Sequence, residues 1–295
     1  MRFRFLFCAV FTATTLVLSH SGNACAEWLQ DVDAGIFYDS NLSRAPTPPD
    51  ERADTALDVS AALGRLFAPT SNDLLAVTAF ARADWYQRYT GLDVVALGVR
   101  AHWRHKFAVG YDAPWLAVAL DGSRDDYRDT LRDSRRLELK AELGRRFTPV
   151  LDGAFGVALD RRYDNNGTPV VPDIPGDVFN LRGVSGDVRL GYAITDAWLL
   201  GARAAVRRGD VESTAQPSLP IFLASSAIAE DHVFGGDDLY AYRLCGTTWT
   251  AALSASLALD DRTSLNFSFA GERTNAAYGL QYSSRVAGLL LAYRP

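Results

Sequence analysis

Residues 136–143 read RLELKAEL, and the alternation in this short stretch decides the fold class. The odd-numbered positions, from Leu137 to Leu143, are all aliphatic, while the even-numbered positions, from Arg136 to Glu142, are all charged. Successive side chains of a β-strand point to opposite faces, whereas a helix would spread both kinds around its surface. The stretch therefore predicts a strand with one aliphatic face and one charged face.

The same period of two returns along the rest of the chain, for example from Leu75 to Trp85 and from Leu265 to Phe269. We predict about twelve strands of roughly ten residues, the length with which a tilted strand crosses a bilayer; a shift in one weak strand pair would give ten or fourteen. The predicted strands cover residues 28–38, 55–67, 74–86, 93–105, 115–124, 135–147, 153–163, 183–194, 197–207, 239–258, 263–273 and 280–293.

The connections between these strands alternate between long and short. The long ones cover residues 39–54, 125–134, 164–182 and 208–238, and the short ones cover 68–73, 148–152, 195–196 and 259–262. Two connections depart from this pattern, because 87–92 is a short outer loop and 106–114 a rather long inner turn. Transmembrane barrels place short turns in the periplasm and longer loops outside the cell. We therefore predict an all-β fold, a single closed antiparallel transmembrane β-barrel, whose even strand number leaves both termini in the periplasm.

The N-terminal segment has the pattern of a secretory signal peptide. Arg2 and Arg4 precede an apolar run over residues 5–18, and Ala24-Cys25-Ala26 provides a small-residue cleavage site. The apolar run is too short to anchor the chain in a bilayer. We expect residues 1–26 to be the signal peptide and residues 27–295 to form the barrel, without a second domain.

Cysteine content agrees with this processing. Cleavage removes Cys8 and Cys25 and leaves Cys245, so no intramolecular disulfide is possible in the mature chain. A lipoprotein interpretation would use Cys25 as the lipidated residue, but Gly22-Asn23-Ala24 lacks the upstream leucine that this signal requires.

Composition excludes two broad classes. The net charge of −5, without a basic cluster, argues against nucleic acid as a partner. A mean hydropathy close to zero is too polar for a bundle of membrane helices. It is compatible with a transmembrane barrel, in which only alternate residues face lipid.

Aromatic residues gather at the predicted strand ends, as Trp85, Tyr86 and Tyr89 do at one end and Trp103 and Phe107 at another. Such girdles mark the two membrane interfaces. Together with the alternation, the signal peptide and the loop asymmetry, they make residues 27–295 resemble the porin-like outer-membrane β-barrel proteins of Gram-negative bacteria. The resemblance implies an integral outer-membrane protein in contact with lipid and lipopolysaccharide.

The last and first strands add to the resemblance. Gly288, Leu291 and Tyr293 match the spacing that the barrel-assembly machinery reads in such proteins, although the chain continues to Arg294-Pro295. Residues 34–45, AGIFYDSNLSRA, are similar to the first strand of barrels from exopolysaccharide-associated systems and from surface lipoprotein assembly modifiers. The resemblance implies the assembly machinery as a partner.

The charged strand faces carry the functional hypothesis. In a barrel they point into the lumen, where charged linings select permeants by sign. Basic residues outnumber acids, which favours a channel for small hydrophilic solutes with a mild preference for anions such as acidic sugars. The alternative is a closed lumen filled by cross-strand salt bridges. The predicted pore-lining residues are Arg82, Asp84, Arg100, His102, Arg104, Glu138, Lys140, Glu142, Asp160, Arg162, Asp187, Arg189, Arg203 and Arg207.

Other chemistry has little support in the sequence. His102 and His105 point to opposite faces of one strand and His232 lies in a loop, so we expect isolated histidines, no metal, no cofactor and no catalytic residue. A lipid-active barrel enzyme stays an alternative, although the His-x-Ser pairing of such enzymes is missing. A second alternative is an accessory barrel for polysaccharide or protein export.

The segment 208–238 contains an unusual apolar stretch, Pro217–Ala224, between polar residues. It could fold into the mouth as a constriction, lie against lipopolysaccharide, or pack on neighbouring loops. The connection 164–182, with three prolines, predicts a stiff surface loop.

Overall fold

The structure is a computed structural model that describes residues 27–164, 167–235 and 238–295. The predicted signal peptide, residues 1–26, lies outside the described residues. Within the described part of the chain, no helix is long and apolar enough to cross a membrane.

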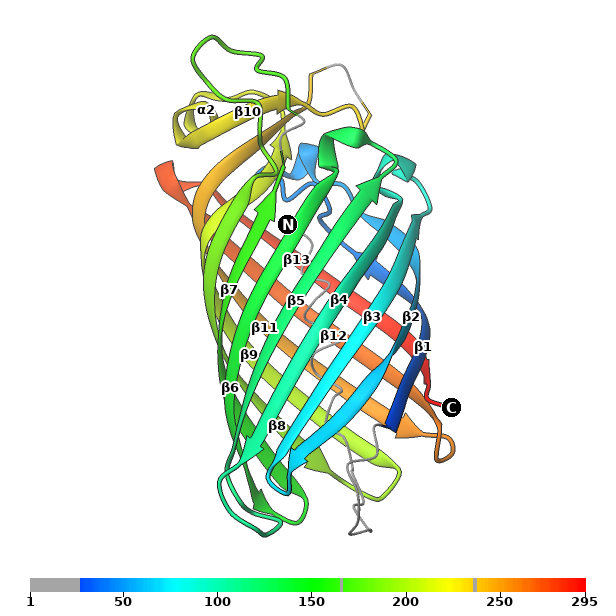
Figure 1. The fold of residues 1–295 in the computed structure, drawn as a ribbon. Helices are drawn as coiled ribbons and strands as arrows, with labels where there is room; N and C mark the ends of the chain where they lie inside the picture. Colours follow the sequence, from blue (N-terminus) through cyan, green and yellow to red (C-terminus); the bar gives the residue numbers. More distant parts are fainter. Residues whose placement is uncertain (1–26, 165–166, 236–237) are drawn as a thin grey trace.

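The described residues form a closed barrel of twelve antiparallel strands, as the alternation predicts (Figure 1). Each strand pairs with its neighbours in the sequence, and β13 pairs with β1 to close the barrel. The barrel strands are β1 (Glu27–Asp39), β2 (Asp54–Thr70), β3 (Asp73–Tyr86), β4 (Val94–Lys106), β5 (Trp115–Tyr127), β6 (Ser134–Thr148), β7 (Leu151–Tyr163), β8 (Leu181–Ala193), β9 (Trp198–Ala215), β11 (Tyr240–Ala258), β12 (Thr263–Ala276) and β13 (Gln281–Tyr293).

The strands are strongly tilted, and the two ends of the barrel differ (Figure 1). Short turns such as 71–72 and 149–150 lie at one end, which we call the turn end, together with the start of β1 and the end of β13. Longer connections such as 40–53, 164–180 and 216–239 lie at the other, which we call the loop end. The predicted asymmetry is confirmed for these connections, while the turn-end connection 107–114 is longer than the loop-end connections 87–93 and 128–133.

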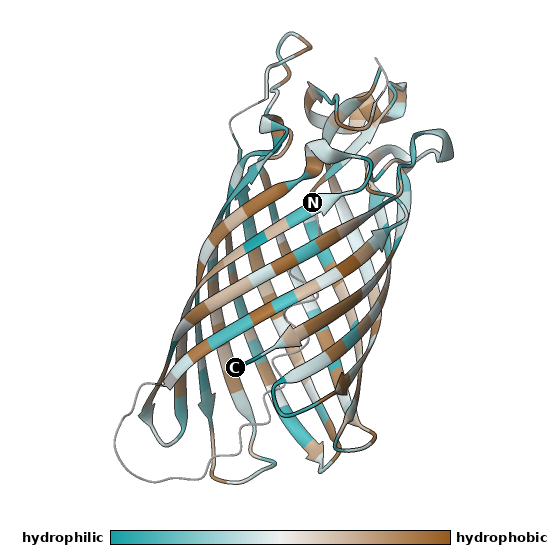
Figure 2. Cartoon of the chain, turned by 90° about the vertical axis from the view of Figure 1, so that its right-hand side faces the viewer, coloured by the Kyte–Doolittle hydropathy of each residue, from teal (hydrophilic) through white to brown (hydrophobic). Residues whose placement is uncertain are grey.

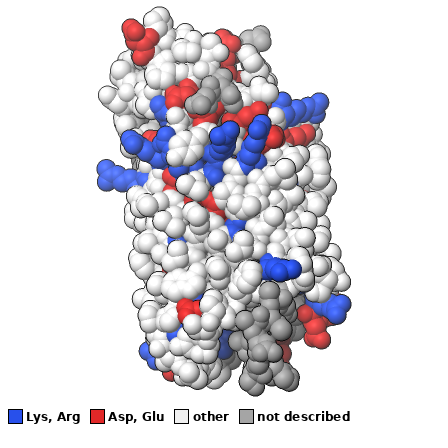
Figure 3. Space-filling view, in the orientation of Figure 1, with Lys and Arg blue, Asp and Glu red and all other residues white. Residues whose placement is uncertain are grey.

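The outer surface of the barrel is apolar. Leu97, Val99 and Leu253 are each at least 60% exposed, and apolar residues alternate with polar ones along the strands (Figure 2). Charged side chains gather mainly towards the loop end, above a largely uncharged middle (Figure 3). A water-soluble protein rarely exposes so continuous an apolar surface, whereas a hydrocarbon environment requires it.

One hairpin departs from the prediction. β9 continues to Ala215, eight residues past the predicted end, and pairs with the equally extended start of β11. The predicted loop 208–238 therefore contains strand residues, a short helix α2 (Leu219–Ala224) and a thirteenth strand, β10 (Ser225–Glu230), which pairs with β11. The sequence concealed this extension because residues beyond the apolar band no longer need to alternate between lipid and lumen.

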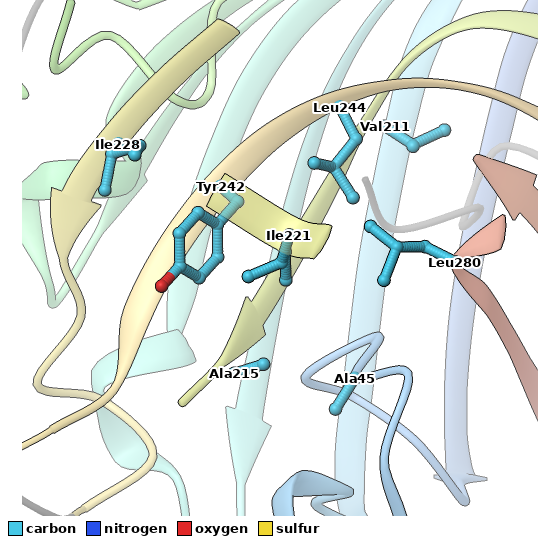
Figure 4. Close-up of a cluster of buried hydrophobic side chains, with 8 residues drawn as sticks. All are labelled: Ala45, Val211, Ala215, Ile221, Ile228, Tyr242, Leu244 and Leu280. Atoms are coloured by element: carbon cyan, nitrogen blue, oxygen red, sulfur yellow. The ribbon is translucent and has the colours of Figure 1, made fainter. Parts of the chain in front are cut away.

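The apolar stretch Pro217–Ala224 packs on neighbouring loops, which is the third of the arrangements considered above. Ile221 of α2 is fully buried against Ala45, Tyr242, Leu244 and Leu280 (Figure 4). Two further small cores lie at the loop end, one around Leu92 and Phe234 and one around Val178 and Phe179. The connections at the loop end therefore pack into a layer with hydrophobic cores of its own. We call this layer the cap.

Candidate functional site in the barrel lumen

All fourteen residues predicted to face the lumen lie on the inner side of the barrel. Each alternates with outward apolar or exposed neighbours, and many form contacts across strands that only inward side chains can make. On β6, for example, Glu138, Lys140 and Glu142 face inward while Leu137 and Leu139 are exposed on the lipid side. Their role in conduction remains a proposal, which is taken up below.

Five of these residues form one continuous chain of ion pairs across β6, β8 and β9. Arg189 contacts Glu142 at 2.9 Å, and Glu142 contacts Lys140 at 2.6 Å. Lys140 lies 3.7 Å from Asp187, which in turn accepts from Arg203 at 3.1 Å. The alternating signs hold the five side chains against the wall and leave the chain with a net positive charge.

Small residues between these strands make the long contacts possible. Gly156 of β7 lies between Glu142 and Asp187 in the strand register, and Ala154 lies between Gly144 and Arg189. A side chain of ordinary size at either position would stand between the charged groups. The sequence contains these two small residues, but their position between charged groups can be recognised only when the strand register is known.

Two other pairs lie further towards the loop end. Arg207 of β9 reaches across β8 to Asp160 of β7 and makes a two-pronged contact at 2.6 and 2.9 Å. Arg100 of β4 pairs with Asp121 of β5, an acid that the sequence analysis did not single out. These pairs show that part of the predicted lining is neutralised locally by cross-strand salt bridges.

The wall made by β11 and β12 is different, because its inward side chains in the middle of the barrel are small and uncharged. Thr248 and Thr250 of β11 face the lumen, as do Ser256 and its hydrogen-bond partner Asn266 of β12. Charged groups face the lumen from β3 to β9, and inward acids such as Asp33 of β1 and Asp58 of β2 extend this lining. The lumen therefore has one wall of hydroxyl and other small uncharged groups and charged groups around much of the rest.

The loop end contains a second set of charges that the sequence analysis did not identify. Arg132, in the connection between β5 and β6, is buried and contacts Asp231 at 2.5 Å as well as Asp129. Its guanidinium lies 4.8 Å from the Phe179 ring and 5.6 Å from the Phe234 ring. Burial alone would lower the pKa of Arg132, but the two carboxylates raise it above its usual value, so the group stays charged.

A similar arrangement fixes the first connection. Arg44 is buried and contacts Asp39 at 2.9 Å and Glu272 at 3.5 Å, so it ties residues 40–53 to strands β1 and β12. Arg162, which was among the predicted lining residues, lies in the same layer and contacts Glu212 at 3.3 Å. Partners so distant in the sequence give no local signal, which explains why Arg44, Glu272 and Glu212 were missed.

The histidines do not form a metal site. In the part of the chain that the structure describes, no group of three or more metal-binding side chains comes together. His102 faces the lumen as predicted, but the expectation of isolated histidines is wrong for His105. That ring lies 2.9 Å from Asp73 and packs between Trp103 and Phe107 at the turn end.

Comparison with known proteins gives no sequence-level relative: no family model and no curated protein matches the chain. Among solved structures, the COG4313 outer membrane channel from Pseudomonas putida F1 is similar, with a TM-score of 0.56 at 12% identity over 94% of this chain and all of that one. The NanC porin matches with a TM-score of 0.47 at 8% identity over 89% of this chain and 98% of that one.

The DcaP channel of Acinetobacter baumannii matches with a TM-score of 0.43 at 10% identity, over 94% of this chain and 99% of that one. At such low identities the likeness concerns the fold, and it is the P. putida channel that supports it. The closed ring of twelve tilted strands, its apolar outer surface and this likeness lead to one conclusion. The chain has the fold of an outer-membrane β-barrel of the porin-like kind.

Proposed function

We propose that this protein is an outer-membrane channel for small hydrophilic solutes, with a preference for anions. The observation that carries the proposal is the lumen lining, in which hydroxyl and other small uncharged groups cover one wall and charged side chains much of the rest. A barrel whose interior served only as a packed core would have no need for so many groups that prefer water. The P. putida structure with the same fold is described as a channel, which agrees with this function.

The preference for anions follows from the balance of charge. Arginine and lysine outnumber carboxylates among the predicted lining residues, and the five-membered ion-pair chain has a net positive charge. A lining of this sign raises the local concentration of anions and lowers that of cations. The partner would be a small anionic solute, an acidic sugar being one example.

The packed cap implies that conduction is gated. The buried pairs of Arg132 and Arg44 and the core around Ile221 hold the connections across the loop end. Solute would pass when these connections move, and the salt bridges within the cap set how often that happens.

The orientation of the barrel is part of the proposal. Long connections at the loop end favour the cell exterior and place both termini in the periplasm. Exposed arginines on the outer face near the loop end, such as Arg135 and Arg182, would contact lipid phosphates there. No contact among the described residues favours the export-accessory or lipid-enzyme alternatives.

The test is single-channel recording of the refolded mature protein in a planar bilayer. We expect discrete, anion-selective steps, and we expect the charge reversals Lys140→Glu and Arg189→Glu to shift the reversal potential towards cations. The variant Arg132→Ala, which removes a contact of the cap, should open more often than the wild type. If the wild type and Arg132→Ala are both folded and both silent, the channel function is wrong.

A further inference from the structure

Two arginines converge near the turn end of the lumen on one aromatic ring, and a third lies close to them. The guanidinium of Arg104, on β4, lies 4.6 Å from the centre of the Trp115 ring, and that of Arg189, on β8, lies 5.7 Å from it. The guanidinium of Arg146, on β6, lies 5.5 Å from the centre of the Tyr111 ring, and its positive charge acts on Arg104 together with that of Arg189. Three positive charges are thus brought together although like charges repel.

The strand register explains how side chains from different strands meet. Trp115, Gly144, Ala154 and Arg189 are successive partners across β5, β6, β7 and β8. A Cβ at Gly144 would lie 2.1 Å from the Trp115 ring, so the indole lies across the bare backbone of β6. Gly144 and Ala154 together leave a hollow in the wall into which Trp115 and Arg189 extend.

The charge of this cluster is only partly balanced. Arg189 has Glu142 as a partner, but within the described ranges no carboxylate lies within 4 Å of the guanidinium of Arg104 or of Arg146. The Nε atom of Arg104 is buried without a hydrogen-bond partner. Asp152 is in electrostatic range of all three arginines, yet it forms no ion pair with them. Arg104 and Arg146 therefore have donors and positive charge left for a ligand.

We propose that Arg104, Arg146 and Arg189 form a binding site for the anionic group, a carboxylate or a phosphate, of the permeating solute. The inference rests on the proposed channel function. In it, the channel's selectivity for anions arises from binding at these arginines. Stacking of its planar face on Trp115 holds the guanidinium of Arg104 in place, which leaves the N–H donors at its edge available to two oxygens of the ligand. Such charge-assisted pairs are the strong hydrogen bonds of proteins.

The test is isothermal titration of the detergent-solubilised mature protein with three probes: glucuronate, glucose 1-phosphate and neutral glucose. We expect at least one anionic probe to bind and glucose not to bind. Binding of glucuronate would indicate a carboxylate ligand, and binding of glucose 1-phosphate a phosphate ligand. The double variant Arg104→Gln/Arg146→Gln should bind at least about tenfold more weakly. Lysine at both positions should restore part of the affinity, because the charge returns without the planar donor pair.

Arg65→Gln is the matched control. Arg65 also stacks on a tryptophan near the turn end, 4.5 Å from the Trp28 ring, but both face outward. This variant should bind like the wild type. Binding of neither anion by the wild type, or equal binding by the wild type and the double variant, would overturn the site.

Failure of the site and failure of the channel are distinguishable, because titration does not depend on conduction. Anion-selective steps without arginine-dependent binding would refute the site and keep the channel. Arginine-dependent binding in a silent barrel would keep the site and refute the channel.

Discussion

At the scale of single residues, the lumen is organised by carboxylates that serve two cations each. Asp187 lies between Lys140 and Arg203, and Glu142 lies between Lys140 and Arg189. Removal of one such acid leaves two positive groups next to each other. The acids in the middle of the network therefore matter more for stability than the arginines at its ends.

The substitution Asp187→Asn tests this order. We expect the free energy of unfolding in micelles to fall by about 1–3 kcal/mol, since a charged hydrogen-bonded group loses both partners. Urea titration followed by circular dichroism measures the change. Asp126→Asn is the control, because Asp126 pairs with Arg124 on the exposed surface and should contribute little. An equal loss in both variants would contradict the network.

The same scale shows what the sequence could predict. Each of the fourteen inward residues follows from alternation alone, because lipid on one side forces every second residue to be apolar. Their pairing does not follow, since Arg207 reaches Asp160 across an intervening strand. Arg132 and Asp231 are 99 positions apart and lie in connections without any period. Such contacts depend on tertiary packing and leave no local pattern.

At the scale of elements, the barrel strands and the cap follow different rules. The strand bounds were predictable to within a few residues, because the thickness and apolar interior of the bilayer set the strand length and the alternation. β9 is the main exception. The structure of the cap is instead set by contacts among its own side chains. Ile221 of α2 is fully buried, while Leu223 of the same helix is half exposed. This difference permits a test of the cap that leaves the barrel unchanged.

Ile221→Ser should release α2 from its core. The loss of a buried aliphatic side chain costs about 2–4 kcal/mol, which is enough to loosen residues 216–239 while the strand ladder stays intact. Limited proteolysis in micelles should then cut this segment faster than in the wild type. Leu223→Ser, on the exposed side of the helix, should be cut at the wild-type rate. Equal rates for the two variants would show that α2 does not fasten the cap.

At the scale of the whole molecule, the two unlike ends predict an orientation. With the loop end outside the cell, protease added to intact bacteria should cut within the connection 164–180 and leave the turn 107–114 untouched. Disruption of the outer membrane should expose the turn as well. Mass spectrometry of the fragments identifies the cut sites, and cleavage of the turn in intact cells would reverse the orientation.

The seam between β1 and β13 has a consequence for the order of assembly. It joins the two ends of the chain through eight residue pairs, from Val32 with Tyr293 to Asp39 with Val286. All other barrel pairings join consecutive barrel strands, and contacts between nearby segments form faster than contacts between distant ones. The ring must therefore close last, and until it closes two strand edges stay unpaired in an environment that offers no water to satisfy them. A helper that shields these edges would act on the last step in the folding of this barrel.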